Sequence, residues 1–294
     1  MSKQAFDAKI QALEDLRAVP GSAVDPLRKA LRERNNFLVS KAAALIGDLH
    51  LAELVPDVLA AFDRFLVDAA KSDPQCWAKN AMVKALKDLE HQDAEVYRKG
   101  IMHIQMEPVW GGQVDTAATL RGACALALSD CRLDDVTLLT VLADALADPE
   151  KSVRVEVALA LSRAGLPEAT ALLRLKALSG DPEPEVIGQC LASLLALNPR
   201  DGIPFAVRFL HGKDDELRME AAAALAQTRE PAALDALKEF SRSRLSADLR
   251  RALLTFLAAS PQREAAEFLF SLGTADALAA LKKSRYRGEF PQVV

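Results

Sequence analysis

Aromatic residues are scarce in this sequence of 294 residues, where they make up 5% of the chain. A β-rich fold relies on bulky and β-branched cross-strand pairs, so this scarcity argues against a sheet protein. Half of the residues are apolar, and Ala and Leu crowd every amphipathic segment. Small and unbranched aliphatic side chains favour closely packed helices. The composition therefore predicts an all-α protein.

Long apolar runs are also missing. The longest ones, such as residues 221–226, fall far short of the roughly 18 residues that span a bilayer. The first residues space Phe6, Ile10 and Leu13 as an amphipathic helix with mixed charges, and they lack the continuous apolar core of a secretion signal. We therefore expect a cytoplasmic protein with no membrane partner.

The sequence shows no spacing typical of a metal site, a catalytic nucleophile or a phosphate-binding loop. Its four cysteines form no C-x-x-C pair, and its four histidines form no pair four residues apart. If one helix carries both Cys124 and Cys131, they lie roughly 10 Å apart, which is too far for a disulfide. We predict reduced, mostly buried thiols, and no catalytic residue, metal or cofactor.

What the sequence does contain is a repeat. Segments such as SVRVEVALALSRAG from Ser152 and ELRMEAAAALAQTR from Glu216 begin polar and continue with apolar residues at helical spacing. One aliphatic position anchors each copy, with steps of 31 to 33 residues in the regular copies and of 40 and 42 in the earlier ones; the anchors are Leu38, Ala78, Leu120, Val153, Val186, Leu217 and Leu249. Because the residues four and eight positions after each anchor are apolar, the repeat predicts a recurring buried stripe.

A second amphipathic segment separates successive copies. Asp148-Pro149 and Asp181-Pro182 stand between the two kinds of segment, and we expect each Asp-Pro to end one helix and begin the next. Each repeat is then helix, tight turn, helix. We predict one continuous domain over residues 1–294, which consists of a cap helix (1–24), looser repeats (25–119) with an insertion (105–116), regular repeats (120–260) and a cap with a tail (261–294).

The stretch DPEKSVRVEVALALSRAGLPEATALL, from Asp148, resembles the HEAT repeat, especially the short bacterial form named after phycobilisome lyases, in which Asp-Pro, Val-Arg and Ala-Leu recur in this order. The resemblance implies a right-handed α-solenoid, a superhelix of about seven to eight HEAT-like hairpins whose second helices line the concave face. The motif is specific for architecture and not for function, because such repeats serve many unrelated purposes. Since stacked repeats expose a long curved surface with little need for chemistry, we predict a non-catalytic scaffold or adaptor that binds a protein or peptide on the concave face.

Two enzymatic alternatives come with this fold. A HEAT-like scaffold also carries alkylpurine DNA glycosylases, which need a basic channel, aromatic residues around the damaged base and a carboxylate, and no residue set here matches them. The net charge of −4 argues against nucleic acid as the partner. Nothing outside the repeat indicates the tetrapyrrole handling of a bilin lyase. The end from Phe240 onward is basic, either as a solvated cap or as a docking site for an acidic partner.

The position after each anchor forms a row that the resemblance places on or near the inner face. Its members are Val39, Lys79, Arg121, Arg154, Ile187, Arg218 and Arg250. The four arginines are candidate partner-binding residues, because a ladder of guanidinium groups can grip an acidic peptide. The alternative is that each arginine bonds the aspartates and carbonyl groups of neighbouring turns.

The insertion contains MEPVWGGQVD, residues 106–115, with one of the two tryptophans. Pro108 stops a helix and the Gly111-Gly112 pair allows positive φ, so we predict a structured turn followed by a helix that Asp115 and Thr116 cap. Trp110 either covers an apolar seam between the loose and the regular repeats or, together with Gln113, contacts a partner.

Overall fold

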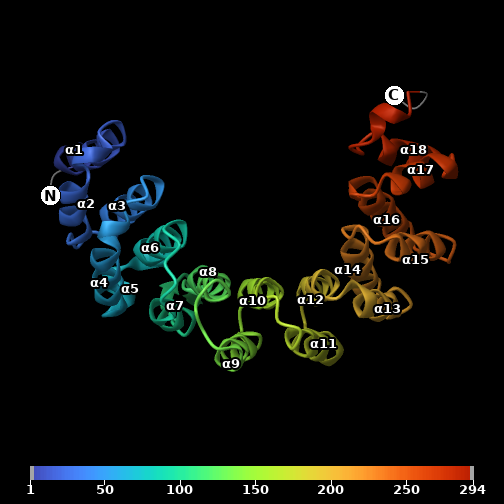
Figure 1. Cartoon of the computed structure of the whole chain (residues 1–294), viewed down its shortest axis with the longest axis horizontal. Helices are drawn as coiled ribbons and strands as arrows, with labels where there is room; N and C mark the ends of the chain where they lie inside the picture. The colour runs from blue at the N-terminus through green and yellow to red at the C-terminus, as the bar shows by residue number, and fades with distance from the viewer. Residues whose placement is uncertain (1–2, 292–294) are drawn as a thin grey trace. The chain divides into compact units, whose positions relative to one another are not determined.

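The computed structural model describes residues 3–291. Helices make up most of this part of the chain (Figure 1), and one two-stranded sheet joins them. The chain divides into two compact units, Met1–Arg163 (unit 1) and Ala164–Val294 (unit 2). We describe each unit separately.

Unit 1 holds ten helices and both strands of the described chain. They are α1 (Lys3–Asp15), α2 (Val24–Leu31), α3 (Asn36–Asp48), α4 (Val55–Leu66), α5 (Ala69–Ser72), α6 (Trp77–Asp88), α7 (Ala94–Ile101), β1 (Met106–Val109), β2 (Gly112–Asp115), α8 (Ala118–Leu128), α9 (Asp135–Ala145) and α10 (Lys151–Arg163). The helices α3, α6, α8 and α10 pack on one another in that order and form one row, and α2 packs on α4 beside it (Figure 1).

Unit 2 contains the remaining helices of the described residues. They are α11 (Ala169–Ser179), α12 (Pro184–Leu197), α13 (Pro199–Leu210), α14 (Asp215–Ala226), α15 (Pro231–Ser241), α16 (Ala247–Ala259), α17 (Arg263–Leu272) and α18 (Ala275–Leu281). Here α12, α14, α16 and α18 form the stacked row, and α13 packs on α15 beside it. The second helices therefore stack in both units.

These elements confirm the predicted all-α solenoid of HEAT-like repeats. Eight successive helix pairs lie within residues 3–291, from α2 and α3 through α17 and α18. The stripe that follows the anchors is buried in every regular copy, for example at Val157 and Leu161, or at Leu253 and Leu257. Because each helix buries this stripe against its neighbours, the stack itself forms the core. The handedness and the single domain stay predictions.

The helix boundaries at the Asp-Pro pairs differ from the prediction. Helix α12 begins at Pro184, and α10 begins at Lys151, so neither starts at the first proline. The carboxylates of Asp148 and Asp181 instead accept hydrogen bonds from the backbone N–H groups two residues later, at 2.8 and 3.0 Å. Each Asp-Pro therefore forms a short turn that precedes the helix.

The thiols lie where the sequence predicts them. Cys76, Cys124 and Cys190 are buried, Cys131 is half-buried, and all four are free. None of the helices within residues 3–291 is both long and apolar enough to cross a membrane.

Candidate partner-binding site

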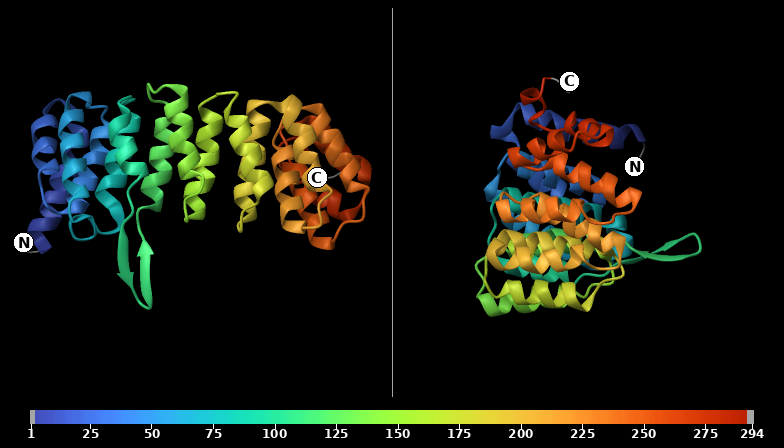
Figure 2. Two further views of the ribbon diagram at one scale, coloured as in Figure 1. Left: turned by 90° about the horizontal axis from the view of Figure 1, so that it is seen from below. Right: turned by 90° about the vertical axis from the view of Figure 1, so that its right-hand side faces the viewer.

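The insertion folds as a β-hairpin. Strands β1 and β2 pair antiparallel, with Met106 opposite Asp115 and Val109 opposite Gly112, so that Trp110 and Gly111 form a two-residue turn. Gly111 has a φ of 87°, which a side chain would disfavour and which the third residue of a type II turn requires. The turn places Trp110 at the tip of a hairpin that projects from the helices, as both views in Figure 2 show.

The tip of the hairpin is apolar and open to solvent. Trp110 has a relative exposure of 103%, and Met106, Val109 and Val114 are also exposed. Gln113 is exposed beside them. Trp110 covers no apolar seam, so that interpretation is wrong.

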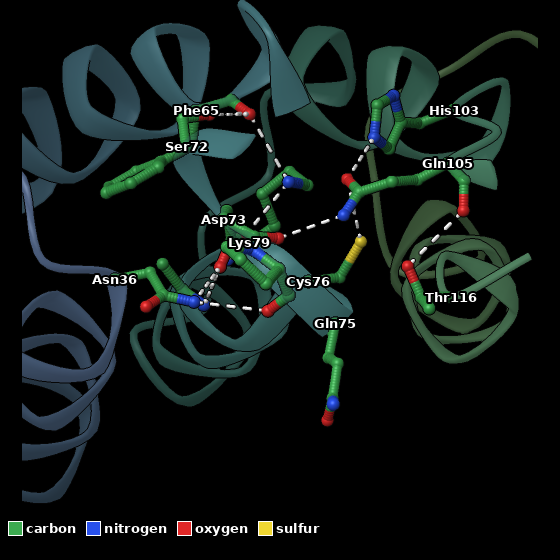
Figure 3. Close-up of polar contacts among 12 residues, drawn as sticks. Asn36, Phe65, Ser72, Asp73, Gln75, Cys76, Lys79, His103, Gln105 and Thr116 are labelled. Carbon is green, nitrogen blue, oxygen red and sulfur yellow. Dashed lines mark hydrogen bonds and ion pairs between the residues drawn. The ribbon is translucent and has the colours of Figure 1, made fainter. Parts of the chain in front are cut away.

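The base of the hairpin is polar and buried. Gln105, immediately before β1, is 2% exposed, and its amide donates to the carbonyl of Asp73 at 2.9 Å and to a Glu107 carboxylate oxygen at 2.6 Å. Its side-chain oxygen accepts hydrogen bonds from the thiol of Cys76 at 3.2 Å and from Nε2 of His103 at 3.1 Å (Figure 3). Gln105 thereby joins the hairpin to the segment before α6.

Two carboxylates complete this base. Glu107 accepts hydrogen bonds from the backbone N–H of Gln75 at 2.6 Å and from the hydroxyl of Thr116 at 2.7 Å. Asp115 accepts from the backbone N–H groups of Gln105 at 3.1 Å and Ala117 at 2.9 Å. Burial acts to raise the pKa of each carboxyl, but these hydrogen bonds prevail and hold both pKa values below the ordinary range. The hairpin base is therefore a network of ionised acceptors with several donors.

The segment before α6 has an unusual backbone. Gln75 and Cys76 have φ values of 60° and 55°, in the left-handed region that residues other than glycine seldom adopt. Two consecutive residues of this kind cost roughly 1–3 kcal/mol each and persist only where surrounding contacts hold them. Here the N–H of Gln75 bonds Glu107 and the thiol of Cys76 bonds Gln105. The same contacts thus hold both the strained turn and the hairpin.

A buried ion pair supports the strained turn from the other side. Nζ of Lys79 lies 2.9 Å from a carboxylate oxygen of Asp73, and both side chains are fully buried. Asp73 also accepts hydrogen bonds from the backbone N–H groups of Ala78 and Lys79 and from the Asn36 amide, while Lys79 donates to the carbonyl of Phe65 (Figure 3). The pair is fully hydrogen-bonded, as a buried pair must be to be tolerated.

The first two arginines of the row are engaged inside unit 1. Arg121, 1% exposed, makes a bidentate pair with Asp148 at 2.7 and 3.0 Å, an ion pair with Asp115 at 2.6 Å and a hydrogen bond to the carbonyl of His103. The buried Arg154 donates to the carbonyls of Asp148 and Pro149. Since neither guanidinium group reaches the surface, both fit the internal alternative, and we leave them out of the proposed partner surface.

The other two arginines lie in unit 2 and differ from each other. Arg218 is half-buried, donates to the carbonyl of Leu210 and the carboxylate of Asp215, and lies over the ring of Phe240. Arg250 is exposed, and its side chain makes no polar contact within the part of the chain that the structure describes. Of the four arginines, Arg250 alone presents an exposed guanidinium group.

An aromatic edge lies beside the hairpin base. The ring centroids of Phe6 and Phe37 are 6.1 Å apart, and those of Phe37 and Trp77 are 5.8 Å apart. Trp77 is 47% exposed and directly follows the turn that bonds Glu107. In this aromatic edge (Phe6, Phe37, Trp77), Phe6 and Phe37 are half-buried and Trp77 is the exposed member, two residues after the Gln75 N–H that bonds Glu107 of the hairpin.

Sequence reasoning missed most of the exposed apolar side chains of the hairpin. It singled out Trp110 and Gln113 but not Met106, Val109 and Val114, whose exposure depends on the strand pairing. The available signal was two short runs with valine on either side of a Trp-Gly turn, a pattern typical of a hairpin. The residues of the base, such as Gln105 and Asp73, lie far apart in the sequence and carry no recognisable motif.

The base shows little capacity for catalysis. Burial raises the pKa of the Cys76 thiol to about 11, so this thiol is neutral and a poor nucleophile. Among residues 3–291, His, Cys, Asp and Glu side chains form no group of three or more that could hold a metal ion. The arrangement fits a structural anchor for the hairpin.

The stacked helix pairs define the protein as a helical-repeat solenoid. Residues 174–258 match the family model described as HEAT repeats. The resemblance stated from the sequence is therefore confirmed, and the matched part lies within unit 2.

Several solved structures resemble the chain. The complex of CpcE and CpcF of the phycocyanin lyase from Nostoc sp. PCC7120 shares 20% identity, with 88% of this chain and 85% of that chain covered and a TM-score of 0.39. YibA of Escherichia coli shares 15%, with 96% and 97% covered and a TM-score of 0.45. Human deoxyhypusine hydroxylase in complex with glycerol shares 20%, with 87% and 90% covered and a TM-score of 0.33. No curated protein matches the chain.

Proposed function

We propose that this protein is a non-catalytic scaffold or adaptor that binds a protein or peptide partner, with the β-hairpin of unit 1 as its anchor. One observation carries the proposal. Trp110 is fully exposed at the tip of a hairpin whose base is held by buried hydrogen bonds. Exposed tryptophan is the residue type most enriched among the side chains that dominate binding energy at protein interfaces.

The rigidity of the base supports this role. An isolated two-stranded hairpin is marginally stable in water, and a mobile one would lose conformational entropy on binding. Here Gln105 and Glu107 bond the segment before α6, and Asp115 pairs with Arg121 of α8, so both strands are tied to the helices before any partner arrives. The indole is therefore presented on a preorganised support, which reduces the entropic cost of binding.

The surroundings favour a protein or peptide. Val109 and Val114 flank the tip and are exposed, and Trp77 is a further exposed aromatic side chain at the start of α6. A partner with an apolar groove or a row of apolar side chains would cover this surface and remove it from water. Arg250 stays a separate candidate partner-binding residue on unit 2.

No observation favours the nucleic-acid or bilin-lyase alternatives. The tip of the hairpin on unit 1 is apolar, whereas contact with phosphate requires clustered arginine and lysine side chains. The arginines that the sequence offers in unit 1 for such contact, Arg121 and Arg154, are buried.

Photo-crosslinking tests the proposal. A benzophenone amino acid at position 110 in the full chain should form a discrete crosslinked product in native lysate, which mass spectrometry would identify. The matched control carries the same group at Val136, an exposed residue on α9 of the same unit. The product should form from position 110 and not from position 136.

The variant Trp110→Ala provides the second arm. Since the side chain makes no buried contact, we expect the free energy of unfolding to change by less than about 0.5 kcal/mol, while recovery of the crosslinked partner in a pull-down falls about tenfold or more. Equal recovery by wild type and variant would exclude Trp110 as the anchor.

A further inference from the structure

A groove runs between α11 and α13 in unit 2. Two adjoining cavities of about 480 and 290 Å³ make up this groove, and Arg208 lines both. From α11 the lining runs from Thr170 to Leu178, which is roughly 12 Å of helix. From α13 it includes Phe205 and Phe209, whose rings lie 5.5 Å apart. The groove is therefore elongated, with an aromatic wall.

Three cations, Arg174, Arg208 and Lys213, border this groove. The guanidinium carbons of Arg174 and Arg208 lie 4.2 and 5.5 Å from the ring centroid of Phe205, and Lys213 lies further along. Within residues 3–291, none of the three side chains makes a hydrogen bond or an ion pair. Two like charges held on one aromatic ring repel each other unless an anion or solvent lies between them.

The two carboxylates that line the groove are engaged in helix caps. Asp201 accepts a hydrogen bond from the side-chain amide of Asn198 at 2.9 Å, and Asp214 accepts from the backbone N–H groups of Glu216 and Leu217. Among the described residues neither acid bonds a cation of the groove, so the three cations have no direct ion pair and the charged side chains of the lining carry a net charge of +1. The groove is thus weakly positive, with the apolar side chains of Leu178 and Phe209 beside the cations.

We propose that this groove binds an acidic peptide segment of a partner protein, with carboxylates at Arg174, Arg208 and Lys213 and apolar side chains against Leu178, Phe205 and Phe209. Guanidinium groups pair with carboxylates in a bidentate manner, and the ring of Phe205 fixes the two arginines in place. The length of the lining matches about four extended residues. A single inorganic anion would fill one end and leave the apolar side chains uncovered.

A random peptide library displayed on phage tests this proposal with the full chain as the bait. Wild type should enrich peptides that combine Asp or Glu with Leu, Ile or Phe. The variant Arg174→Glu/Arg208→Glu should lose them, whereas the matched variant Arg244→Glu/Arg285→Glu, which makes the same charge change at exposed sites of unit 2, should retain them. Trp110→Ala should also retain them, which separates this groove from the hairpin.

Fluorescence anisotropy with the most enriched peptide gives the magnitude. We expect the affinity to fall at least about tenfold in Arg174→Glu/Arg208→Glu, to stay within twofold in the control, and to weaken as salt is added. If Arg174→Glu/Arg208→Glu melts at a lower temperature than wild type, a second variant replaces it in the test. This variant, Arg208→Gln/Lys213→Gln, changes two exposed residues and should lower the affinity about fivefold.

Three outcomes would overturn the proposal. One is an enriched set with no excess of acidic residues, and another is equal affinity of the peptide for wild type and for each groove variant. The third is tighter binding of a labelled single-stranded oligonucleotide than of the peptide at the groove. That result would identify phosphate as the ligand.

Discussion

One repeat position has different surroundings in the two units. In unit 1, two of the four residues after the anchor are buried cations with an aspartate partner, Lys79 with Asp73 and Arg121 with Asp148. The other two are the buried Val39 and the buried Arg154, which donates to backbone carbonyls. In unit 2, this residue is the buried Ile187, the half-buried Arg218 or the exposed Arg250. The repeat fixes where this residue stands on its helix. Whether a cation there is buried depends on a carboxylate from another turn that reaches it.

The insertion explains part of this difference. Asp115, at the end of β2, pairs with Arg121, and Asp73 lies in the strained segment that bonds the hairpin. The regular repeats of unit 2 contain no such insertion, and the half-buried Arg174 and the exposed Arg208 and Lys213 border a groove instead. Similar cations therefore stabilise the interior of unit 1 and contribute surface charge in unit 2.

Lys79→Ala should give the largest effect. Removal of the ammonium group leaves the carboxylate of Asp73 buried without its partner, which costs about 3–5 kcal/mol of the free energy of unfolding of unit 1. Urea denaturation followed by tryptophan fluorescence measures this loss, because Trp77 and Trp110 both lie in unit 1.

Lys84→Ala is the matched control, since Lys84 is exposed on the same helix and should change the free energy by less than about 0.5 kcal/mol. The double variant Asp73→Asn/Lys79→Met should be more stable than Lys79→Ala, because it removes both charges. If Lys79→Ala and Lys84→Ala unfolded alike, the buried pair would contribute nothing to unit 1.

Two glutamine variants compare a buried arginine of the row with an exposed one. Arg121→Gln leaves Asp115 and Asp148 without their cation and should destabilise unit 1 by about 2–3 kcal/mol. Arg250→Gln should change the stability of unit 2 by less than about 0.5 kcal/mol. Hydrogen exchange resolved by mass spectrometry assigns each change to its unit. Equal effects would contradict the distinction between buried and exposed members.

The pH dependence of stability should have opposite signs in the two units. Burial lowers the pKa of His103 in unit 1. As the pH falls below about 6.5, the imidazole therefore binds a proton more readily in the unfolded chain than in the folded one, and unit 1 loses stability. Burial, with the charge of Glu185, raises the pKa of Glu220 in unit 2. The folded state then holds the proton more tightly, and its stability rises as the pH falls towards about 4.5.

Urea titrations at pH 7 and pH 5 check this smallest effect, with tryptophan fluorescence for unit 1 and circular dichroism for the whole chain. Glu220→Gln should remove the gain in unit 2, and His103→Gln should reduce the loss in unit 1. Below about pH 4 a further loss in unit 1 is expected, because Glu107 and Asp115 have lowered pKa values and become protonated there. A loss of stability in both units between pH 7 and pH 5 would contradict the comparison.

The fold was largely predictable from the sequence, because helical spacing repeats about every 32 residues and each buried position recurs with it. The insertion was predicted as a structured turn but not as a hairpin, since four-residue strands give too weak an alternation. The candidate site was predicted only through Trp110 and Gln113. The burial of Arg121 depends on Asp115 and Asp148, which lie on either side of it in sequence and approach it only in the folded chain.

The helical class, the register of the buried stripe and the place where the repeat is interrupted all follow from local spacing along the chain, and the amino-acid sequence was therefore sufficient to predict them. The tertiary structure alone decided which cations are buried, which aromatic side chain is exposed and where α11 and α13 leave a groove. The physical reason is that burial and pairing depend on side chains from other turns, and their approach is set by packing across repeats.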